Sequence, residues 1–238
     1  MSYETFAYYY DSLMDPQFYE DYYQFINQQC QFEEVLELGC GTGEIAIRLA
    51  KDNKTVVATD LSSDMLEVAK QKAIYEDVPL ILQKVDMSDF STSHKIDLIL
   101  CLCDSLNYLL DEKDIISTFS NVFDSLNEKG TFIFDIDSLY KMNTILKDYQ
   151  EDLEDDEFTF HWHVNQIEDG YVHHYVYIED KIEHDIVEEN HYQKTYHVKQ
   201  YIQWLNQAGF HNIQYYSDFS SYHEDCERII FVCRKESI

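Results

Sequence analysis

The sequence predicts an α/β fold in which helices cover both faces of a mostly parallel β-sheet. Short apolar segments alternate with segments of helical periodicity between residues 34 and 136, as in chains whose parallel strands are joined by crossover helices. Three of the six glycines fall within residues 39–43, directly after the first apolar segment. From Phe158 the pattern changes to a period of two, which predicts an antiparallel β insertion after the fifth strand.

The first half of the chain contains the alternating strands and helices. The expected strands are residues 34–38, 55–59, 80–85, 95–101 and 130–136. The expected helices are residues 16–29, 44–51, 64–75 and 111–126. Asp15 can cap the first of these helices, and Pro16 suits its first turn. Strands this apolar are buried on both faces, so helices are expected on both sides of the sheet.

The segment after the fifth strand has a different pattern. A short helix is expected at residues 141–149, and the acidic run at residues 151–157 is interpreted as a solvated connection. Beyond it, the period of two places Trp162 on one face of a strand and His161 and His163 on the other. The other expected features are a hairpin turn at residues 168–170 and strands at residues 171–178 and 182–196. Such a long insertion is expected to have a role of its own.

The C-terminal segment returns to the α/β pattern. Residues 198–208 are expected to form a helix, with Gly209 as its C-terminal cap. Residues 212–216 and 228–234 are expected strands with no helix between them. They are therefore predicted to be antiparallel neighbours.

The chain is strongly acidic, with a formal net charge of −29. Its longest basic run is Arg234–Lys235. Proteins that bind nucleic acids present basic stripes that neutralise phosphates, so the composition disfavours a nucleic-acid partner. An anionic membrane surface is disfavoured for the same reason. The excess of carboxylates modestly favours cationic ligands.

The composition also predicts a cytoplasmic protein. Residues 1–6 lack the basic and apolar regions of a signal peptide. No apolar stretch approaches the ~18 residues that a membrane-spanning helix needs. The six cysteines form no Cys-x-x-Cys pair, and several lie in apolar segments, which is typical of reduced thiols.

The segment from Glu37 to Gly43 (ELGCGTG) is the strongest indication of a ligand site. A buried strand runs into a glycine-rich turn, and a helix starts directly after it, so a ligand can approach the backbone closely. A P-loop needs a lysine after its last glycine, where this chain has Glu44. Gly41, Gly43 and Ala46 formally satisfy a dinucleotide fingerprint. A dinucleotide and S-adenosylmethionine both remain possible from the turn alone.

Acidic residues before the turn and at the next two strand ends bear on the choice between these cofactors when they are taken together. Asp60 lies 21 residues beyond Gly39 and can accept both ribose hydroxyls of either cofactor. Asp86 can accept from an adenine amino group while Met87 packs on the ring. Glu37 suits a ligand that carries an ammonium group. Together they favour the methyl donor.

In this order, the ELGCGTG turn, Asp60 and Asp86–Met87 resemble the motifs of class I S-adenosylmethionine-dependent methyltransferases. The resemblance covers residues 34–137 and extends to the C-terminal strands. It implies a Rossmann-like, seven-stranded, mostly parallel sheet with an antiparallel last strand. It also implies S-adenosylmethionine as the cofactor.

The resemblance implies a set of cofactor-binding residues. Glu37, Gly39, Cys40, Gly41 and Gly43 are expected near the methionyl part, Asp60 and Leu61 at the ribose, and Asp86 and Met87 at the adenine. The other implied contacts are Tyr22, Met65, Leu102 and Cys103.

The resemblance and the change of pattern also predict how the chain is divided. Residues 1–238 are expected to form one methyltransferase domain. Its parts are an N-terminal helical cover (1–33), a cofactor-binding core (34–150), an antiparallel insertion or lid (151–197) and the end of the core sheet (198–238).

The sequence is less specific on the acceptor side. Members of the family often have a small residue and then histidine after the fourth strand, where this chain has Cys103 to Tyr108 (CDSLNY). The residues expected near the acceptor are Tyr10, Asn107, His163 and His191. No catalytic role is assigned to them, although a histidine of the lid is a candidate proton acceptor.

Seven histidines fall between residues 161 and 197. Two histidines two positions apart on a strand share a face, which makes a metal site conceivable. The spacing specifies no third ligand, so no metal is predicted. Surface exposure or cross-strand pairing is the expected role of most of them.

The predicted function is transfer of a methyl group from S-adenosylmethionine to a small-molecule acceptor, with an amine as one candidate. In-line displacement would depend on orientation of the reactants and on water exclusion beneath the insertion. One alternative is an NAD(P)-dependent oxidoreductase, although the chain offers no Tyr-x-x-x-Lys pair. Another is a non-catalytic S-adenosylmethionine-binding protein. The sequence leaves open whether the protein is a monomer or a dimer.

Overall fold

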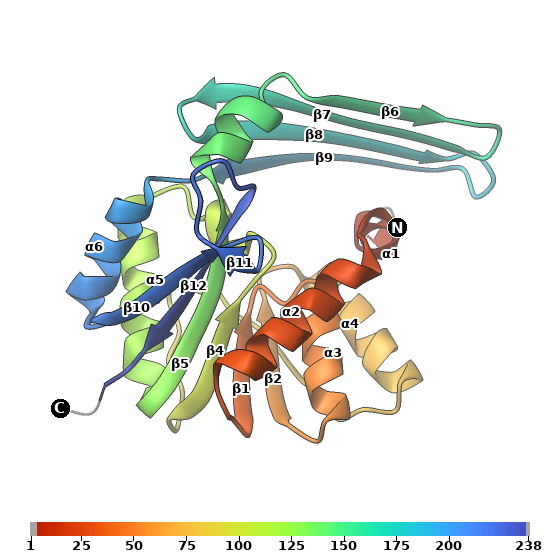
Figure 1. The fold of residues 1–238 in the computed structure, drawn as a ribbon. Helices are drawn as coiled ribbons and strands as arrows, with labels where there is room; N and C mark the ends of the chain where they lie inside the picture. Colours follow the sequence, from red (N-terminus) through yellow and green to blue (C-terminus); the bar gives the residue numbers. More distant parts are fainter. Residues whose placement is uncertain (1–3, 237–238) are drawn as a thin grey trace.

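The structure is a computed structural model that describes residues 4–236, and it contains two β-sheets (Figure 1). The larger sheet has the strand order β11-β10-β12-β5-β4-β1-β2-β3. Its strands are β1 (Glu34–Leu38), β2 (Thr55–Asp60), β3 (Ile81–Lys84), β4 (Ile96–Cys101), β5 (Leu126–Asp137), β10 (Asn212–Ser217), β11 (Ser220–Ser221) and β12 (Arg228–Arg234). β12 runs antiparallel to both β5 and β10. The predicted seven strands and antiparallel last strand are therefore present, with the two-residue β11 added at the edge.

Helices cover both faces of this sheet. They are α1 (Glu4–Leu13), α2 (Pro16–Gln29), α3 (Glu44–Lys51), α4 (Ser63–Tyr75), α5 (Glu112–Ser125) and α6 (Val198–Ala208). α2, α3 and α4 lie over one face, and α5 and α6 lie over the other (Figure 1). None of the helices in the described part of the chain is long and apolar enough to span a membrane.

Alternate residues of each strand supply two separate cores. On β1, Val35 packs with the α2 and α3 side, and Leu36 and Leu38 pack with the α5 and α6 side. Both clusters consist of almost fully buried aliphatic and aromatic side chains, each of which contributes about 1.5–3 kcal/mol when removed from water. Burial on both faces explains why the strands have near-continuous apolar sequences.

The second sheet is antiparallel and lies beside the carboxyl ends of the main strands (Figure 1). Its strands in spatial order are β6 (Gln150–Glu154), β7 (Phe158–Glu168), β8 (Tyr171–Asp180) and β9 (Asp185–Lys194). A single π-helical turn, Lys141–Ile145, joins β5 to this sheet where a longer helix was expected. Met142 and Leu146 bury this turn against Val164 and Val172. These two valines lie on the underside of the second sheet, which is the face that Phe160 and Trp162 share and that is turned toward the main sheet.

One interpretation of the sequence was wrong. The acidic run at residues 151–157 is not simply a connection, because its first half belongs to β6. β6 pairs with β7 along its whole length, from Gln150 opposite His163 to Glu154 opposite Thr159. An edge strand keeps one side open to solvent, so it tolerates charged side chains that an interior strand does not.

The N-terminal helix α1 packs against the underside of the second sheet. Tyr9 joins the cluster formed by Phe160, Ile178 and their neighbours. Its hydroxyl donates to Asp180 Oδ2 at 2.6 Å. A space is therefore enclosed between α1, the second sheet and the carboxyl ends of the main strands.

Candidate active site

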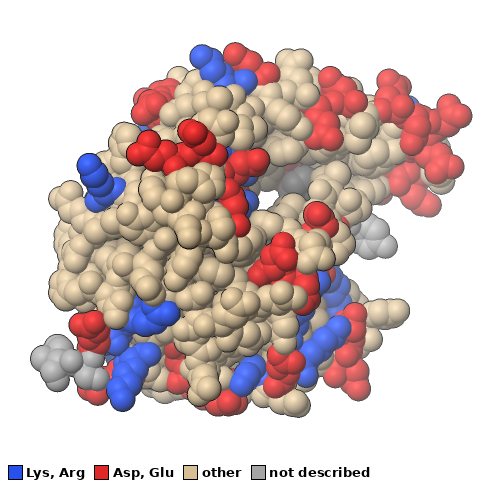
Figure 2. Space-filling view, viewed as in Figure 1, with Lys and Arg blue, Asp and Glu red and all other residues tan. Residues whose placement is uncertain are grey.

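The space between the two sheets is a cavity of about 1260 Å³. Figure 2 shows the hollow between the second sheet and the body of the molecule. Its lining comes from α1 and α2, from the ends of β1, β2 and β4, and from the inward face of β6 to β9. Ligands of open α/β sheets bind at the carboxyl ends of the strands, which form the floor of this cavity.

The glycine turn follows β1 and borders the floor. Gly39 has φ +66°, and a Cβ there would lie 2.7 Å from the Ser105 side chain. Gly41 has φ +53°, and a Cβ there would meet nothing within 4 Å. Gly39 therefore allows close packing inside the protein, whereas Gly41 leaves open space beside the backbone where a ligand can approach.

Asp60, at the end of β2, fixes the shape of this turn. Its Oδ2 accepts from the Gly41 backbone N–H at 2.9 Å, and its Oδ1 accepts from the Ser62 N–H at 2.8 Å. A carboxylate oxygen can accept a second hydrogen bond, so both oxygens can still receive a hydroxyl from the cavity. The neighbouring Leu61 is exposed and also lines the cavity.

Glu37 is the buried carboxyl group of the floor. Its side chain is almost inaccessible, and burial raises its pKa to about 8, although a hydrogen bond from the Ala46 backbone opposes the shift. Its Oε2 has no hydrogen-bond partner among the described residues. A buried carboxyl oxygen without a partner is costly, and a ligand ammonium group would both pair with it and favour its ionised form.

The opposite end of the floor is formed by Asp86 and Met87 after β3. Ser88 donates through both its backbone N–H and its hydroxyl to Asp86 Oδ1, at 2.8 and 2.7 Å. These bonds orient the carboxylate at the edge of the cavity. Met87 packs between Cys101 and the glycine turn, where its flexible side chain can adapt to a flat ring.

The structure brings most of the predicted cofactor residues together. Those that line the cavity are Glu37, Gly39, Cys40, Gly41, Asp60, Leu61, Met65, Asp86, Met87, Leu102 and Cys103. Gly43 does not line it and instead precedes α3 with φ +80°. Tyr22 is also absent from the lining because its ring is fully buried edge-on against Phe18 and Phe219.

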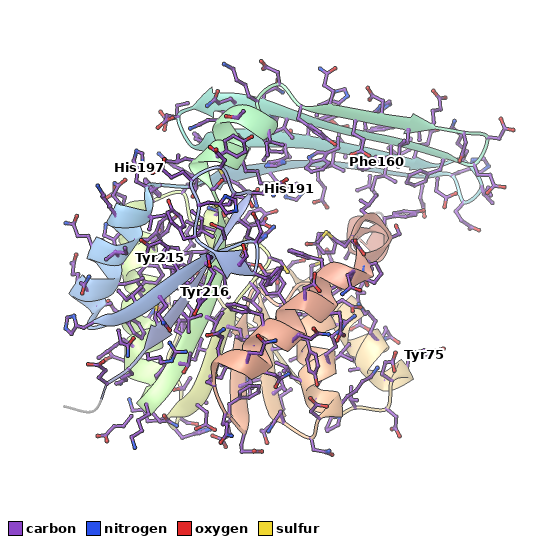
Figure 3. All side chains as sticks on the ribbon, in the orientation of Figure 1. Tyr75, Phe160, His191, His197, Tyr215 and Tyr216 are labelled. Atoms are coloured by element: carbon purple, nitrogen blue, oxygen red, sulfur yellow. The ribbon has the colours of Figure 1, made fainter. Side chains whose placement is uncertain are left out.

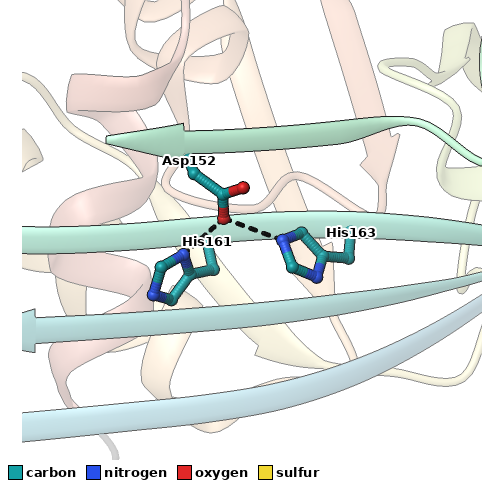
Figure 4. A group of neighbouring side chains, drawn as sticks. All are labelled: Asp152, His161 and His163. Atoms are coloured by element: carbon teal, nitrogen blue, oxygen red, sulfur yellow. Dashed lines mark hydrogen bonds and ion pairs between the residues drawn. The ribbon is translucent and has the colours of Figure 1, made fainter. Parts of the chain in front are cut away.

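Of the four residues that were predicted near the acceptor, two line the cavity and two do not. Tyr10 and His191 line the cavity. Asn107 is buried in the scaffold, where it donates to the Lys194 carbonyl and accepts from the Asp137 N–H, both at 2.8 Å. His163 lies on the outward face of β7 beside Asp152 (Figure 4), because alternation along the strand turns it away from Trp162 and the cavity.

Arg228 organises a set of carboxylates that the sequence did not single out. Its guanidinium is bonded to Asp104 at 3.1 Å and to Asp135, and it lies 3.7 Å from Asp137. Asp104 Oδ2 also accepts from Gln193 on β9 at 2.6 Å. Asp104 therefore connects the loop after β4 to β12 and to the second sheet.

The backbone at this junction is strained. Cys103 and Asp104 have φ of +55° and +53°, a region that residues other than glycine rarely occupy. The Asp104 N–H donates to Asp135 Oδ2 at 2.9 Å and fixes the turn. Two consecutive residues in this conformation cost of order 1–3 kcal/mol each and are typical of functional sites.

His174 on β8 provides a neutral hydrogen-bond donor in the cavity. The indole N–H of Trp162 donates to its Nδ1 at 3.1 Å, so the ring proton of the neutral form is on Nε2. Burial lowers the pKa of His174 to about 4, which keeps the ring uncharged near neutral pH. Nε2 has no hydrogen-bond partner among the described residues, so it can donate to a bound molecule.

His191 on β9 occupies a different environment. Its Nε2 lies 3.0 Å from Glu189 Oε2, and its ring meets Tyr108 edge-on with centroids 6.0 Å apart. Figure 3 shows His191 and Phe160 on the side of the second sheet that faces the body of the molecule. The carboxylate can compensate the charge of this ring when it accepts a proton.

The cavity lining is strongly acidic. Among the described residues that line it, eleven carry carboxyl groups and only Lys141 and Arg228 carry cationic groups. Both cations are already engaged, Lys141 with Asp137 at 3.0 Å and Arg228 with Asp104 and Asp135. Burial raises the pKa of Asp137 to about 6 in spite of this pairing. The electrostatics therefore favour a cationic ligand or a ligand that becomes cationic.

Known proteins resemble this chain over its whole length. A family model described as a methyltransferase domain matches residues 35–130. A methyltransferase-like protein of Geobacillus sp. strain WCH70 is 34% identical, and the alignment covers 99% of this chain and 100% of that protein. The methyltransferase-like protein YqeM of Bacillus subtilis strain 168 is 31% identical over 99% of this chain and 98% of its own.

Solved structures show the same arrangement. An S-adenosylmethionine-dependent methyltransferase from Clostridium acetobutylicum ATCC 824 has a TM-score of 0.88 and 30% identity over 99% of both chains. The CcbJ methyltransferase from Streptomyces caelestis shares the fold, with a TM-score of 0.84 over 99% and 98% of the two chains at 16% identity. The protein therefore belongs to the class I S-adenosylmethionine-dependent methyltransferases and is an enzyme that uses S-adenosylmethionine as its methyl donor.

Proposed function

We propose that the enzyme methylates the nitrogen of a small-molecule amine that binds beneath the second sheet. The observation that carries this proposal is the acidic lining of the cavity, in which the two cationic side chains found among the described lining residues are already paired. Carboxylates hold an amine in its ammonium form and stabilise the cationic product of methylation. In this proposal, residues 151–197 act as the lid that holds the acceptor and excludes water.

We also propose how the chain holds the methyl donor. S-adenosylmethionine supplies a methyl group that its sulfonium centre activates for nucleophilic attack. Glu37 would accept from the ammonium of the methionyl part, Asp60 from the ribose hydroxyls and Asp86 from the adenine amino group. The aromatic ring of Tyr10, on α1, would lie against the cationic centre and stabilise it.

The acceptor must lose a proton to attack, because only the neutral amine has a free electron pair. His191 would take this proton, and Glu189 would compensate the charge of the ring. The nitrogen electron pair then forms the new bond to the methyl carbon, while the carbon–sulfur bond breaks and its electron pair stays on sulfur. Correct orientation of the two reactants can lower such a barrier by up to about 7–11 kcal/mol.

A screen of methyl transfer tests the proposal. Purified enzyme would be incubated with methyl-labelled S-adenosylmethionine and pools of amines, alcohols, phenols and RNA, and the products identified by mass spectrometry. We expect a product with the label on nitrogen. His191→Asn should lower kcat by at least about tenfold without changing the affinity for S-adenosylhomocysteine. A label found only on oxygen, carbon or RNA would refute the amine as acceptor.

We further propose that the enzyme acts in the cytoplasm. All six cysteines are unpaired, and four of them are buried. Reduced thiols persist in that compartment. Intact cells and lysed, denatured cells would be treated with a membrane-impermeant thiol reagent, and the enzyme would then be captured and its label measured. We expect label only in the lysed, denatured sample.

A further inference from the structure

The outward face of the second sheet carries a cluster that the methyl-transfer site does not use. Asp152 on β6 lies opposite His161 on β7, and His163 follows two positions later on the same face (Figure 4). Asp152 Oδ1 is 2.5 Å from His161 Nδ1 and 2.8 Å from His163 Nε2. The three ligand atoms all lie within 4.8 Å of one another.

We propose that Asp152, His161 and His163 form a binding site for a divalent transition-metal cation, which fastens β6 to β7. Two imidazoles and one carboxylate are a ligand set that Zn²⁺, Ni²⁺, Co²⁺ and Cu²⁺ accept. Mg²⁺ and Ca²⁺ prefer oxygen ligands and are not expected to bind tightly.

The geometry supports three ligands for one ion. Ligand atoms about 2.0–2.2 Å from a common ion stand about 3.0–3.5 Å apart. The two carboxylate–imidazole separations are 2.5 and 2.8 Å, and the two imidazole nitrogens lie within 4.8 Å of each other, so rotation of the side chains can bring all three atoms to these distances. The two histidines would bind as neutral rings, His161 through Nδ1 and His163 through Nε2, with the ring proton on the other nitrogen. The side chains are 35%, 34% and 53% exposed for His161, His163 and Asp152, so water can complete the coordination.

The surrounding residues suit a cation. His161 lies beside the Tyr177 ring and His163 beside the Tyr175 ring on β8, so both imidazoles are supported on the side away from β6. The net charge of −29 also raises the local concentration of cations. Spacing along the chain suggested only two ligands, because the third comes from the acidic segment that forms β6.

A metal at this position would affect the cavity through β6. The residues on either side of Asp152, Glu151 and Leu153, line the cavity on the inward face of the same strand. β6 is an edge strand, and among the strands of the described residues its one partner is β7. A shared ion would hold it there, and the two lining residues would be held with it.

Titration calorimetry of the full chain with Ni²⁺, without S-adenosylmethionine, tests the site. We expect one Ni²⁺ per chain in the wild type and binding at least about tenfold weaker in Asp152→Asn and in the double variant His161→Asn/His163→Asn. His173→Asn is the matched control, because His173 is a partly exposed histidine of the same sheet whose Nε2 instead contacts Asn190. Mg²⁺ should produce no comparable heat.

Failure to bind Ni²⁺ in the wild type, or undiminished binding in the double variant, would overturn the proposal. Circular dichroism would establish that the variants are folded, which is expected because none of the three side chains is buried. Hydrogen exchange tests whether the bound ion fastens β6 to β7. Ni²⁺ should slow exchange at residues 150–154 in the wild type and not in Asp152→Asn. If Ni²⁺ binds but exchange there is unchanged, the cation does not fasten β6.

Discussion

The floor and the roof of the cavity differ in how they are built. The floor lies at the ends of parallel strands. There Asp60 accepts from the backbone N–H of Gly41 in the glycine turn and from that of Ser62 in its own loop, all within 23 residues of Gly39. The roof is the underside of the antiparallel sheet, where Trp162, His174 and His191 come from three different strands. The floor is specified by short motifs, whereas the roof depends on strand register and on side chains far apart in the chain.

This difference suggests a division of function. The floor would bind S-adenosylmethionine, the methyl donor that is common to the family, and the roof would select the acceptor. Arg228 and Asp104 lie where the two meet, since they join β12, the loop after β4 and β9. Variants of the floor should therefore change cofactor affinity, and variants of the roof should change acceptor kinetics.

The strongest test of the floor is Asp60→Ala. The substitution removes the acceptor for two backbone N–H groups and for the ribose, and charged hydrogen bonds of this kind contribute about 1.5–3 kcal/mol each. We expect the affinity for S-adenosylhomocysteine, measured by calorimetry, to fall by at least about 100-fold. Asp89→Ala, an exposed acid outside the cavity, should leave it unchanged. Undiminished binding by Asp60→Ala would refute the assignment of the floor.

Glu37→Gln should have opposite effects on binding and on stability. Loss of the carboxylate should weaken S-adenosylhomocysteine binding by about 10- to 100-fold. The raised pKa of Glu37, about 8, means that the folded protein holds a proton which the unfolded chain has already lost. Wild-type stability therefore falls as the pH rises from about 4.5 to 8, and it stays reduced above that.

The glutamine variant lacks this penalty. Its free energy of unfolding without ligand, measured in urea, should exceed that of the wild type by about 2–5 kcal/mol at pH 9, and by less at pH 6. Lower stability of Glu37→Gln at pH 9 would show that the carboxylate is structural and is not kept for a ligand.

Asp104→Asn tests the junction between floor and roof. The variant weakens the pairing with Arg228 and places an amide where Gln193 now donates, which should loosen β9 over the cavity. We expect kcat/KM for the acceptor to fall by about tenfold, while the affinity for S-adenosylhomocysteine changes by less than about twofold. The surface variant Asp111→Asn is the control. An equal loss of both quantities would mean that the cavity is not divided in this way.

The floor could be predicted from the sequence because its determinants are local. Strands buried on both faces have continuous apolar sequences, and Gly39, Gly41 and Asp60 occupy fixed places after two of them. Tyr22 shows the limit of this reasoning, since helical periodicity predicts that it is buried but not whether it faces a ligand. In the structure Phe18 and Tyr19 line the cavity instead.

The roof could not be predicted in the same way. Alternation along β7 does separate His163 from Trp162, but it does not indicate which face covers a cavity. The acidic run at residues 151–157 contains no apolar alternation, so β6 becomes recognisable only from its pairing with β7. The bond between Trp162 and His174 depends on the register of β7 and β8, which places Val164 and not Trp162 directly opposite His174.

His174→Phe is the finest test of the roof. Phenylalanine keeps the stacking on Trp162, whose ring lies 6.0 Å from that of His174, but it removes the Nε2–H donor. A neutral hydrogen bond contributes about 0.5–1.5 kcal/mol, so the KM for the acceptor should rise about fivefold with little change in S-adenosylhomocysteine affinity. Steady-state kinetics would measure the KM for the acceptor, and calorimetry would measure the affinity for S-adenosylhomocysteine.

The pH dependence of stability provides an independent measurement. The pKa of His174 is lowered to about 4, so below pH 6.5 the unfolded chain takes up a proton that the folded protein resists, and the wild type loses stability between pH 6.5 and 4. The phenylalanine variant lacks this contribution, although it leaves the Trp162 N–H unpaired at a cost of about 1–3 kcal/mol. It should therefore be less stable than the wild type at pH 7.5, and the difference should shrink by about 2 kcal/mol at pH 5. A difference independent of pH would show that His174 is not held neutral by burial, and the roof would then lack its uncharged donor.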